Sequence, residues 1–224
     1  MKKVVLVITA IFAIIGSAKS QNMYGETLSG VPLKIKIYEN VNGTPYLNEE
    51  WTKGTVVLEN GTKSGSLDLK FDLVAQELIF KDASGNPLNF ANRVKEFVLQ
   101  SSGNNQQLYR RNFPKTEDST PDDFFQVISD KNVKLLKRTK KFIIDTKQYA
   151  SSTVDRSIEE RTAYYILSGN TLIKVSNAKN LQKAFPKVSA ELETYLSKNK
   201  LNTKNEADLI LIANYLDQLT TGRN

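Results

Sequence analysis

The chain contains neither histidine nor cysteine, which limits the chemistry that its side chains can perform. A Ser-His-Asp triad, a Cys-His dyad and the usual zinc sites each need at least one of these residue types. Carboxylate chemistry, a Ser/Lys pair and a metal site built from oxygen ligands remain open. The sequence therefore predicts no cofactor and argues against an enzyme of the common hydrolase classes.

Three acidic doublets are the best candidates for carboxylate chemistry, namely Glu49-Glu50, Asp122-Asp123 and Glu159-Glu160. Two carboxylates can cleave a glycoside when they face each other across one cleft at about 5 to 9 Å. All three doublets fall in segments that we expect to be loops, so we favour solvated turns. A carboxylate-based glycosidase is kept as the least favoured function.

Two shorter motifs also have simpler interpretations. Ser176 and Lys179 have a Ser-x-x-Lys spacing, but no partner motif accompanies them and Ser176 stands where we expect a helix N-cap. Residues 82–86 look like half of a calcium loop, yet the later glutamate is missing, which favours a plain turn. The sequence has no phosphate-binding glycine loop and no dinucleotide fingerprint.

A basic run within residues 131–147 is the strongest local charge feature. Its members are Lys131, Lys134, Lys137, Arg138, Lys140, Lys141 and Lys147. Apolar residues between them predict a strand with one buried and one positive face. A lysine-coated edge strand that resists unwanted pairing is the favoured interpretation. The alternative is a docking face for an anionic partner, formed by Lys134, Lys137, Arg138, Lys140 and Lys141.

A second candidate surface contains Tyr46 and Trp51, the single tryptophan, in a loop-like segment. Aromatic residues of this kind anchor either an interface or the local core. We favour the core and keep partner binding as the alternative.

Hydropathy patterns predict an α+β fold. From residue 31, short alternating segments separated by turn residues predict antiparallel strands at intervals of about ten residues, as in a meander that forms a small barrel or sandwich. Strands are expected at 34–38, 54–58, 67–72, 77–81, 94–100, 124–128, 133–137, 140–145, 162–167 and 171–175. A polar insertion is expected around 101–123, with one short strand near 108–113, and a further loop at 149–160.

After residue 175 the hydrophobic period changes to that of helices. Two to three helices are expected in 176–224, packed on the sheet. Pro186 can start the second helix, and Thr203 with Glu206 fits a capping box for the third, at 206–219.

The first 20 residues predict a cleavable signal peptide. Lys2 and Lys3 precede an apolar stretch at 4–15, and Ala18-Lys19-Ser20 fits a cleavage site before Gln21. The apolar stretch is shorter than the roughly 20 residues that span a bilayer, and we expect no transmembrane span in the mature form. The β-rich domain would then cover 21–175, and cleavage would lower the formal net charge from +7 to +4.

Two segments resemble a recurring pattern in secreted proteins of Bacteroidota that have no assigned activity. They are GTPYLNEEWTKGTVVLENG at 43–61 and YYILSGNTLIKV at 164–175, the latter followed by the helix near 181–185. The resemblance implies export and a bacterial envelope compartment, and it transfers no catalytic residue.

We therefore expect a non-enzymatic accessory or interaction protein of the cell envelope. It would be periplasmic, docked at an outer-membrane protein complex, with anionic lipid or the cell wall as further contacts and no nucleic-acid partner. A barrel-type carrier of a small apolar ligand is the main alternative.

Overall fold

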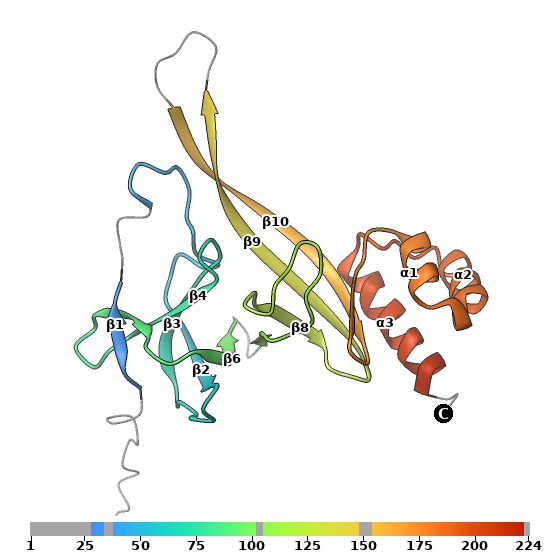
Figure 1. Cartoon of the computed structure of the whole chain (residues 1–224), viewed down its shortest axis with the longest axis horizontal. Helices are drawn as coiled ribbons and strands as arrows, with labels where there is room; N and C mark the ends of the chain where they lie inside the picture. The colour runs from blue at the N-terminus through green and yellow to red at the C-terminus, as the bar shows by residue number, and fades with distance from the viewer. Residues whose placement is uncertain (1–27, 34–37, 102–104, 148–153, 222–224) are drawn as a thin grey trace, which may run out of the picture.

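The computed structural model describes residues 28–33, 38–101, 105–147 and 154–221. The signal peptide predicted at 1–20 and most of the strand predicted at 34–38 lie outside the described residues. The described chain forms one antiparallel sheet followed by a helical C-terminal region, so the α+β class and the meander are confirmed. Figure 1 shows the first strands at one end of the molecule and the helices at the other.

Eleven strands are described. They are β1 (Gly30–Pro32), β2 (Thr52–Leu58), β3 (Leu67–Asp72), β4 (Glu77–Lys81), β5 (Pro87–Phe90), β6 (Val94–Gln100), β7 (Gln106–Arg110), β8 (Phe125–Ser129), β9 (Val133–Lys147), β10 (Val154–Ser168) and β11 (Thr171–Lys174). The helices are α1 (Ala178–Ala184), the 3-10 turn η3 (Pro186–Val188), α2 (Ser189–Lys198) and α3 (Glu206–Thr221).

The strand order is β1-β5-β4-β3-β2-β6-β7-β8-β9-β10-β11. The sheet is open rather than closed into a barrel, because β1 and β11 stand at its two ends. β2 joins two sequential meanders, since it pairs with β3 on one side and with β6 on the other. Gly54 is paired on both sides, and a Cβ there would lie 2.6 Å from Leu69 Cδ1 and closer still to the Val98 carbonyl oxygen. Only glycine allows the three strands to approach this closely.

The first core cluster lies on one face of β2 to β7. Alternation along β3, at the position where the sequence predicted a strand, places Leu67, Leu69 and Phe71 on this face. Phe71 forms edge-to-face contacts with Phe97 and Phe124 at centroid distances of 5.2 and 5.5 Å. Four aromatic rings therefore fill the centre of this part of the sheet, namely Phe71, Phe97, Tyr109 and Phe124.

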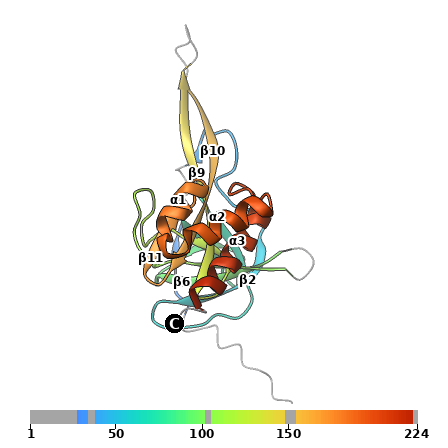
Figure 2. The ribbon, with the colours of Figure 1, turned by 90° about the vertical axis from the view of Figure 1, so that its right-hand side faces the viewer.

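The C-terminal strands are covered on both faces. Leu135 and Ile166 face the helices and are fully buried by residues such as Leu192 and Ile212. Their neighbours Leu136 and Tyr165 face the other way, into a smaller cluster completed by Phe113, Phe125, Leu167 and Leu172. Figure 2, seen from the helical end, shows the helices in front of the sheet.

The segment between β7 and β8 provides that second cover. The sequence predicted an exposed polar connection, but Phe113, Ser119 and Asp123 are each less than 8% exposed. The ring of Phe113 lies edge-on to Phe125 at 5.3 Å. Although the segment is polar on average, its few buried side chains make it part of the fold.

β9 and β10 form a long hairpin that extends beyond the rest of the sheet (Figure 1). The loop predicted at 149–160 is wrong for residues 154–160, which belong to β10. Asn42 contacts the outer edge of β10, donating from its N–H to the Arg156 carbonyl and accepting from the Ile158 N–H, each at 2.9 Å. On the other side, the Lys141 N–H donates to the Leu73 carbonyl at 3.0 Å.

Two of the predicted helix caps are wrong. Asn177 rather than Ser176 caps α1, because its side chain accepts from the Asn180 N–H at 2.9 Å. Asn205 rather than Thr203 caps α3, accepting from the Asp208 N–H at 3.1 Å. Both caps lie within two residues of the predicted position, and they leave the side chain of Glu206 free for other contacts.

Candidate partner-binding surface

The basic run of β9 does not form a single positive face. Side chains alternate along a strand, so Lys134, Arg138 and Lys140 share one face with Leu136. Lys137 and Lys141 lie on the opposite face. The expectation of one buried and one positive face is therefore wrong, because cationic and apolar residues are interleaved on both faces.

Arg138 and Lys140 hold the covering segment before β8. Arg138 is 7% exposed and donates to Asp123 Oδ2 at 3.1 Å and to the carbonyl oxygen of Asp118. Lys140 Nζ lies 3.3 Å from the other oxygen of Asp123. Asp123 is itself buried, so these contacts pair its charge within the protein.

The other three basic residues also have internal partners. Lys137 Nζ lies 2.9 Å from Glu206 Oε2 on α3, and Lys134 Nζ lies 2.5 Å from Asp130 Oδ1. Lys141 is 8% exposed and donates to the carbonyl oxygens of Thr44 and Tyr46 at 3.0 and 2.7 Å. All five predicted partner-binding cations are therefore engaged in stabilising the fold.

The edge-strand interpretation of this run holds only in part. β9 pairs with β10 along its whole length and with β8 at residues 135–137. Beyond residue 137, its free side meets the turn after β3 through Leu73 and through Gln76, whose side-chain Nε2 donates to the Thr139 carbonyl at 3.3 Å.

Tyr46 and Trp51 lie outside the apolar clusters, in contrast to the favoured core interpretation. Both side chains are half-buried. Lys70 Nζ lies 4.7 Å from the ring centroid of Tyr46 and 5.3 Å from that of Trp51. Lys81 Nζ lies 4.8 Å from the Trp51 ring. We call these four residues the aromatic–lysine surface.

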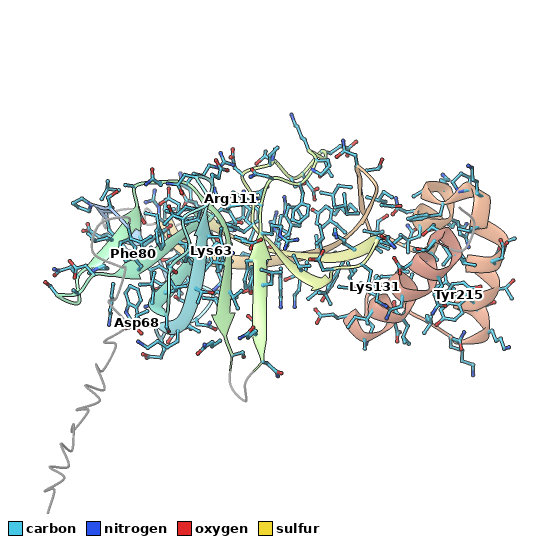
Figure 3. The ribbon with its side chains drawn as sticks, turned by 90° about the horizontal axis from the view of Figure 1, so that it is seen from below. Lys63, Asp68, Phe80, Arg111, Lys131 and Tyr215 are labelled. Atoms are coloured by element: carbon cyan, nitrogen blue, oxygen red, sulfur yellow. The ribbon has the colours of Figure 1, made fainter. Side chains whose placement is uncertain are left out.

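The sheet explains how these residues meet. Thr52 pairs with Leu69, which places Trp51 beside Lys70. Lys70 pairs with Ile79, and Lys81 is two residues further along β4 on the same face. This face is opposite the one that carries Leu69 and Phe80 into the core. Figure 3 labels Asp68 and Phe80 in this part of the molecule.

A hollow of about 380 Å³ adjoins Tyr46 on the same face, with Tyr38, Asp72 and Ile79 in its lining. Tyr38 donates its hydroxyl to Asp72 Oδ2 at 2.6 Å. Burial, together with this hydrogen bond and the Asp72 charge, raises the pKa of the Tyr38 hydroxyl well above its usual range. Asp72 also accepts from the N–H groups of Val74 and Ala75. The hollow is thus held in shape by a fully bonded carboxylate.

The acidic doublets lie on separate elements with different partners. Asp122 lies 2.5 Å from Arg93 Nη2, while Asp123 belongs to the Arg138 contacts. Glu159 and Glu160 are in β10 rather than in a loop, and Glu159 lies 2.8 Å from Arg161 Nε.

Glu49 and Glu50 are exposed and line a separate hollow of about 510 Å³ before β2. The described residues of the other two doublets do not line it. Within the described ranges no cluster of three or more acidic side chains suits a metal ion. Likewise, none of the described helices is both long and apolar enough to cross a bilayer.

Comparison of the chain with protein-family models, with curated proteins and with solved structures finds no match.

Sequence reasoning found Tyr46 and Trp51 but missed Lys70 and Lys81. The alternation in residues 67–72 did place Lys70 on the polar face of its strand. What the sequence could not show is the pairing of β2 with β3, which brings that face beside Trp51.

Proposed function

We propose that this chain is an exported, non-enzymatic accessory protein of the cell envelope, which docks on an acidic partner protein through the aromatic–lysine surface. The proposal places it in the periplasm, peripheral to an outer-membrane complex. Its compartment rests on the signal-peptide pattern of residues 1–20.

One observation carries the choice of surface. Lys70 and Lys81 have no ion pair with any residue that the structure describes, and both place Nζ over the Trp51 ring. The five predicted partner-binding cations of β9, namely Lys134, Lys137, Arg138, Lys140 and Lys141, by contrast all have partners within the chain. A cation over an aromatic ring gains only about 0.5 to 1 kcal/mol at an exposed site, so it remains available to pair with a carboxylate of another molecule.

The composition of this surface suits a protein interface. Tryptophan and tyrosine supply most of the binding energy in many interfaces, and cations beside them select an acidic partner. The long apolar stems of the two lysines add contact area while their charged ends stay in water.

Affinity purification from native envelopes tests the proposal. The tagged chain should recover an envelope protein, and Trp51→Ala or the pair Lys70→Gln/Lys81→Gln should reduce that recovery at least tenfold. Charge-matched controls are Lys131→Gln/Lys134→Gln, which remove two positive charges near the helical end and should recover the partner as the unchanged chain does.

Two results would refute this function. One is a folded chain that recovers no envelope protein and remains monomeric. The other is recovery that is lost in the Lys131/Lys134 variant but kept in the Lys70/Lys81 variant, which would assign docking to the basic run.

Export has its own test. Fractionation of cells that express the tagged chain should yield a protein outside the cytoplasm whose first residue is Gln21. Recovery of the uncleaved chain in the cytoplasm would contradict the proposed compartment.

A further inference from the structure

A hollow of about 250 Å³ lies beside the N-terminal strands, at the start of β4, the end of β5 and the start of β6. Its main lining residues are Glu77, Leu78, Phe90, Arg93, Val94 and Arg111. It is smaller than the 300 to 1,000 Å³ typical of sites for drug-sized molecules. A ligand that fits here must be small.

Arg111 forms no contact ion pair with the described residues, although the charges of Asp122, Glu59 and Glu77 act on it from a greater distance. It has no ion pair and no side-chain hydrogen bond with any described residue, and its Nε is buried without a partner. Its guanidinium carbon lies 3.7 Å from the ring centroid of Phe124, which is 1% exposed. Neighbouring Arg93, by contrast, is bound by Glu59 and Asp122 at 2.8 and 2.5 Å.

Burial makes the charged form of Arg111 less stable than it would be in water. Burial, with a smaller contribution from Arg93, lowers the pKa of Arg111 to about 10, and the charges of Asp122, Glu59 and Glu77 oppose this shift only in part. The guanidinium therefore stays charged at neutral pH. An anion placed against it would offset the desolvation, since charge-assisted hydrogen bonds are the strong ones in proteins.

The lining also includes a carboxylate. Glu77 is exposed there and accepts from Asn89 Nδ2 at 3.2 Å, while Asn89 Oδ1 is buried without a hydrogen-bond donor. Leu78, Phe90 and Val94 add apolar side chains to the lining. The hollow thus combines a cation, a carboxylate and an apolar floor within the space of one small molecule.

We propose that this hollow binds a free α-amino acid with an apolar side chain. The carboxylate of the ligand lies against the Arg111 guanidinium, its ammonium group faces Glu77, and its side chain packs on Leu78, Phe90 and Val94. A dianion would be repelled by Glu77, and an uncharged molecule would leave Arg111 unpaired. This site is independent of the proposed docking function, because Arg111 is no part of the aromatic–lysine surface.

Calorimetric titration of the full chain with three matched compounds tests the assignment. L-Leucine should bind saturably. Leucinamide, which lacks the carboxylate, and N-acetyl-leucine, which lacks the ammonium group, should each bind at least tenfold more weakly. Absence of saturable binding of leucine, isoleucine and phenylalanine by the folded chain in the millimolar range would overturn the proposal.

Two variants test the named residues. Arg111→Gln should weaken leucine binding roughly tenfold to hundredfold, as expected for loss of a hydrogen bond to a charged group. Lys115→Gln, at an exposed site nearby, is the matched control and should leave binding unchanged.

Because Arg111 packs on Phe124, its replacement could also disturb the fold. Glu77→Gln, at an exposed position, avoids this problem. It should weaken leucine about tenfold and leave N-acetyl-leucine unaffected. Equal leucine affinity in the unchanged chain and in both folded variants would refute the site.

Discussion

Buried charged side chains hold the segment before β8 against the β9–β10 hairpin. Asp123 is 4% exposed, and its carboxylate is shared by Arg138 and Lys140. A buried charge is costly unless it is paired and hydrogen-bonded. These residues therefore fix the segment before β8 against the hairpin, and they explain why the basic run is not a free surface.

Replacing Arg138 with alanine should lower the free energy of unfolding by about 2 to 4 kcal/mol, because Asp123 would keep only one cationic partner in a buried site. Urea denaturation measures this loss. Combining Arg138→Met with Asp123→Asn should cost less than the sum of the two single changes. Strict additivity would show that the two side chains are not coupled.

At Gly54, the absence of a side chain is what allows β2 to lie this close to both neighbouring strands. Gly54→Ala should destabilise the protein by about 1 to 3 kcal/mol, because the added methyl group would collide with Leu69 and the Val98 backbone. Thr55→Ala, at the exposed neighbouring position, is the control and should change stability by less than about 0.5 kcal/mol. Equal thermal stability of the two variants would contradict this account.

At the scale of elements, the covering segment 111–124 shows where composition misleads. Its polar residues predict an exposed insertion, yet the side chain of Phe113 covers the face of the sheet that carries Phe125 and Tyr165. Tyr165 also donates its hydroxyl to Asp118 Oδ1 at 3.0 Å. Local sequence says little about such a segment, because its partners include residues as far away as Lys174, 56 positions after Asp118.

Phe113→Ala should lower the free energy of unfolding by about 3 kcal/mol and make segment 111–124 sensitive to limited proteolysis. Lys115→Ala, exposed in the same segment, should do neither. A protease-resistant Phe113→Ala variant would indicate that the charge contacts alone hold the segment.

The half-buried strand at 67–72 was predictable because its residues alternate between an apolar and a polar face. The strand at 77–81 was predictable because a short apolar run leads into a strong turn. The start of β10 was missed for the opposite reason. Residues 154–160 pair with β9 in a projecting hairpin and are almost all exposed, so no apolar period marks them. Only Tyr46 and Trp51 of the aromatic–lysine surface could be predicted from the sequence, because strand pairing is what brings Lys70 and Lys81 beside them.

At the scale of the whole molecule, the described strands form an open sheet, and aromatic side chains fill the centre of its N-terminal part. The apolar-carrier alternative requires a closed barrel with an empty interior, which the described residues do not form. The two ends of the molecule are joined through the sheet. The helices are attached to it by apolar contacts and by Glu206, which binds Lys137 and the Tyr164 hydroxyl at 2.9 and 2.8 Å.

This attachment should weaken in acid. Burial alone would raise the pKa of Glu206, but hydrogen bonds from Lys137 and Tyr164 lower it below its usual 4.5. The unfolded chain therefore takes up the proton first, so the stabilisation is present above about pH 4.5 and is lost as the pH falls through the lower folded-state value. Melting temperatures measured between pH 7 and pH 3 should decline below about pH 4.5.

Glu206→Gln should flatten that decline, whereas Glu193→Gln, exposed on α2, should leave it unchanged. The Asp118 carboxyl, held by Lys174, Thr116 and Tyr165, also has a lowered pKa despite partial burial, so the Glu206 variant should retain part of the acid sensitivity. An identical pH profile in the Glu206 variant would refute this role.

The strand order has a kinetic consequence. Eight of the ten described strand pairings join consecutive strands, and only β1–β5 and β2–β6 bring more distant ones together. Chains whose contacts are mostly local search less conformational space and fold faster. No disulfide has to form, because the chain has no cysteine. We therefore expect the rate of folding to be limited by closure of the two long-range pairs, β1–β5 and β2–β6.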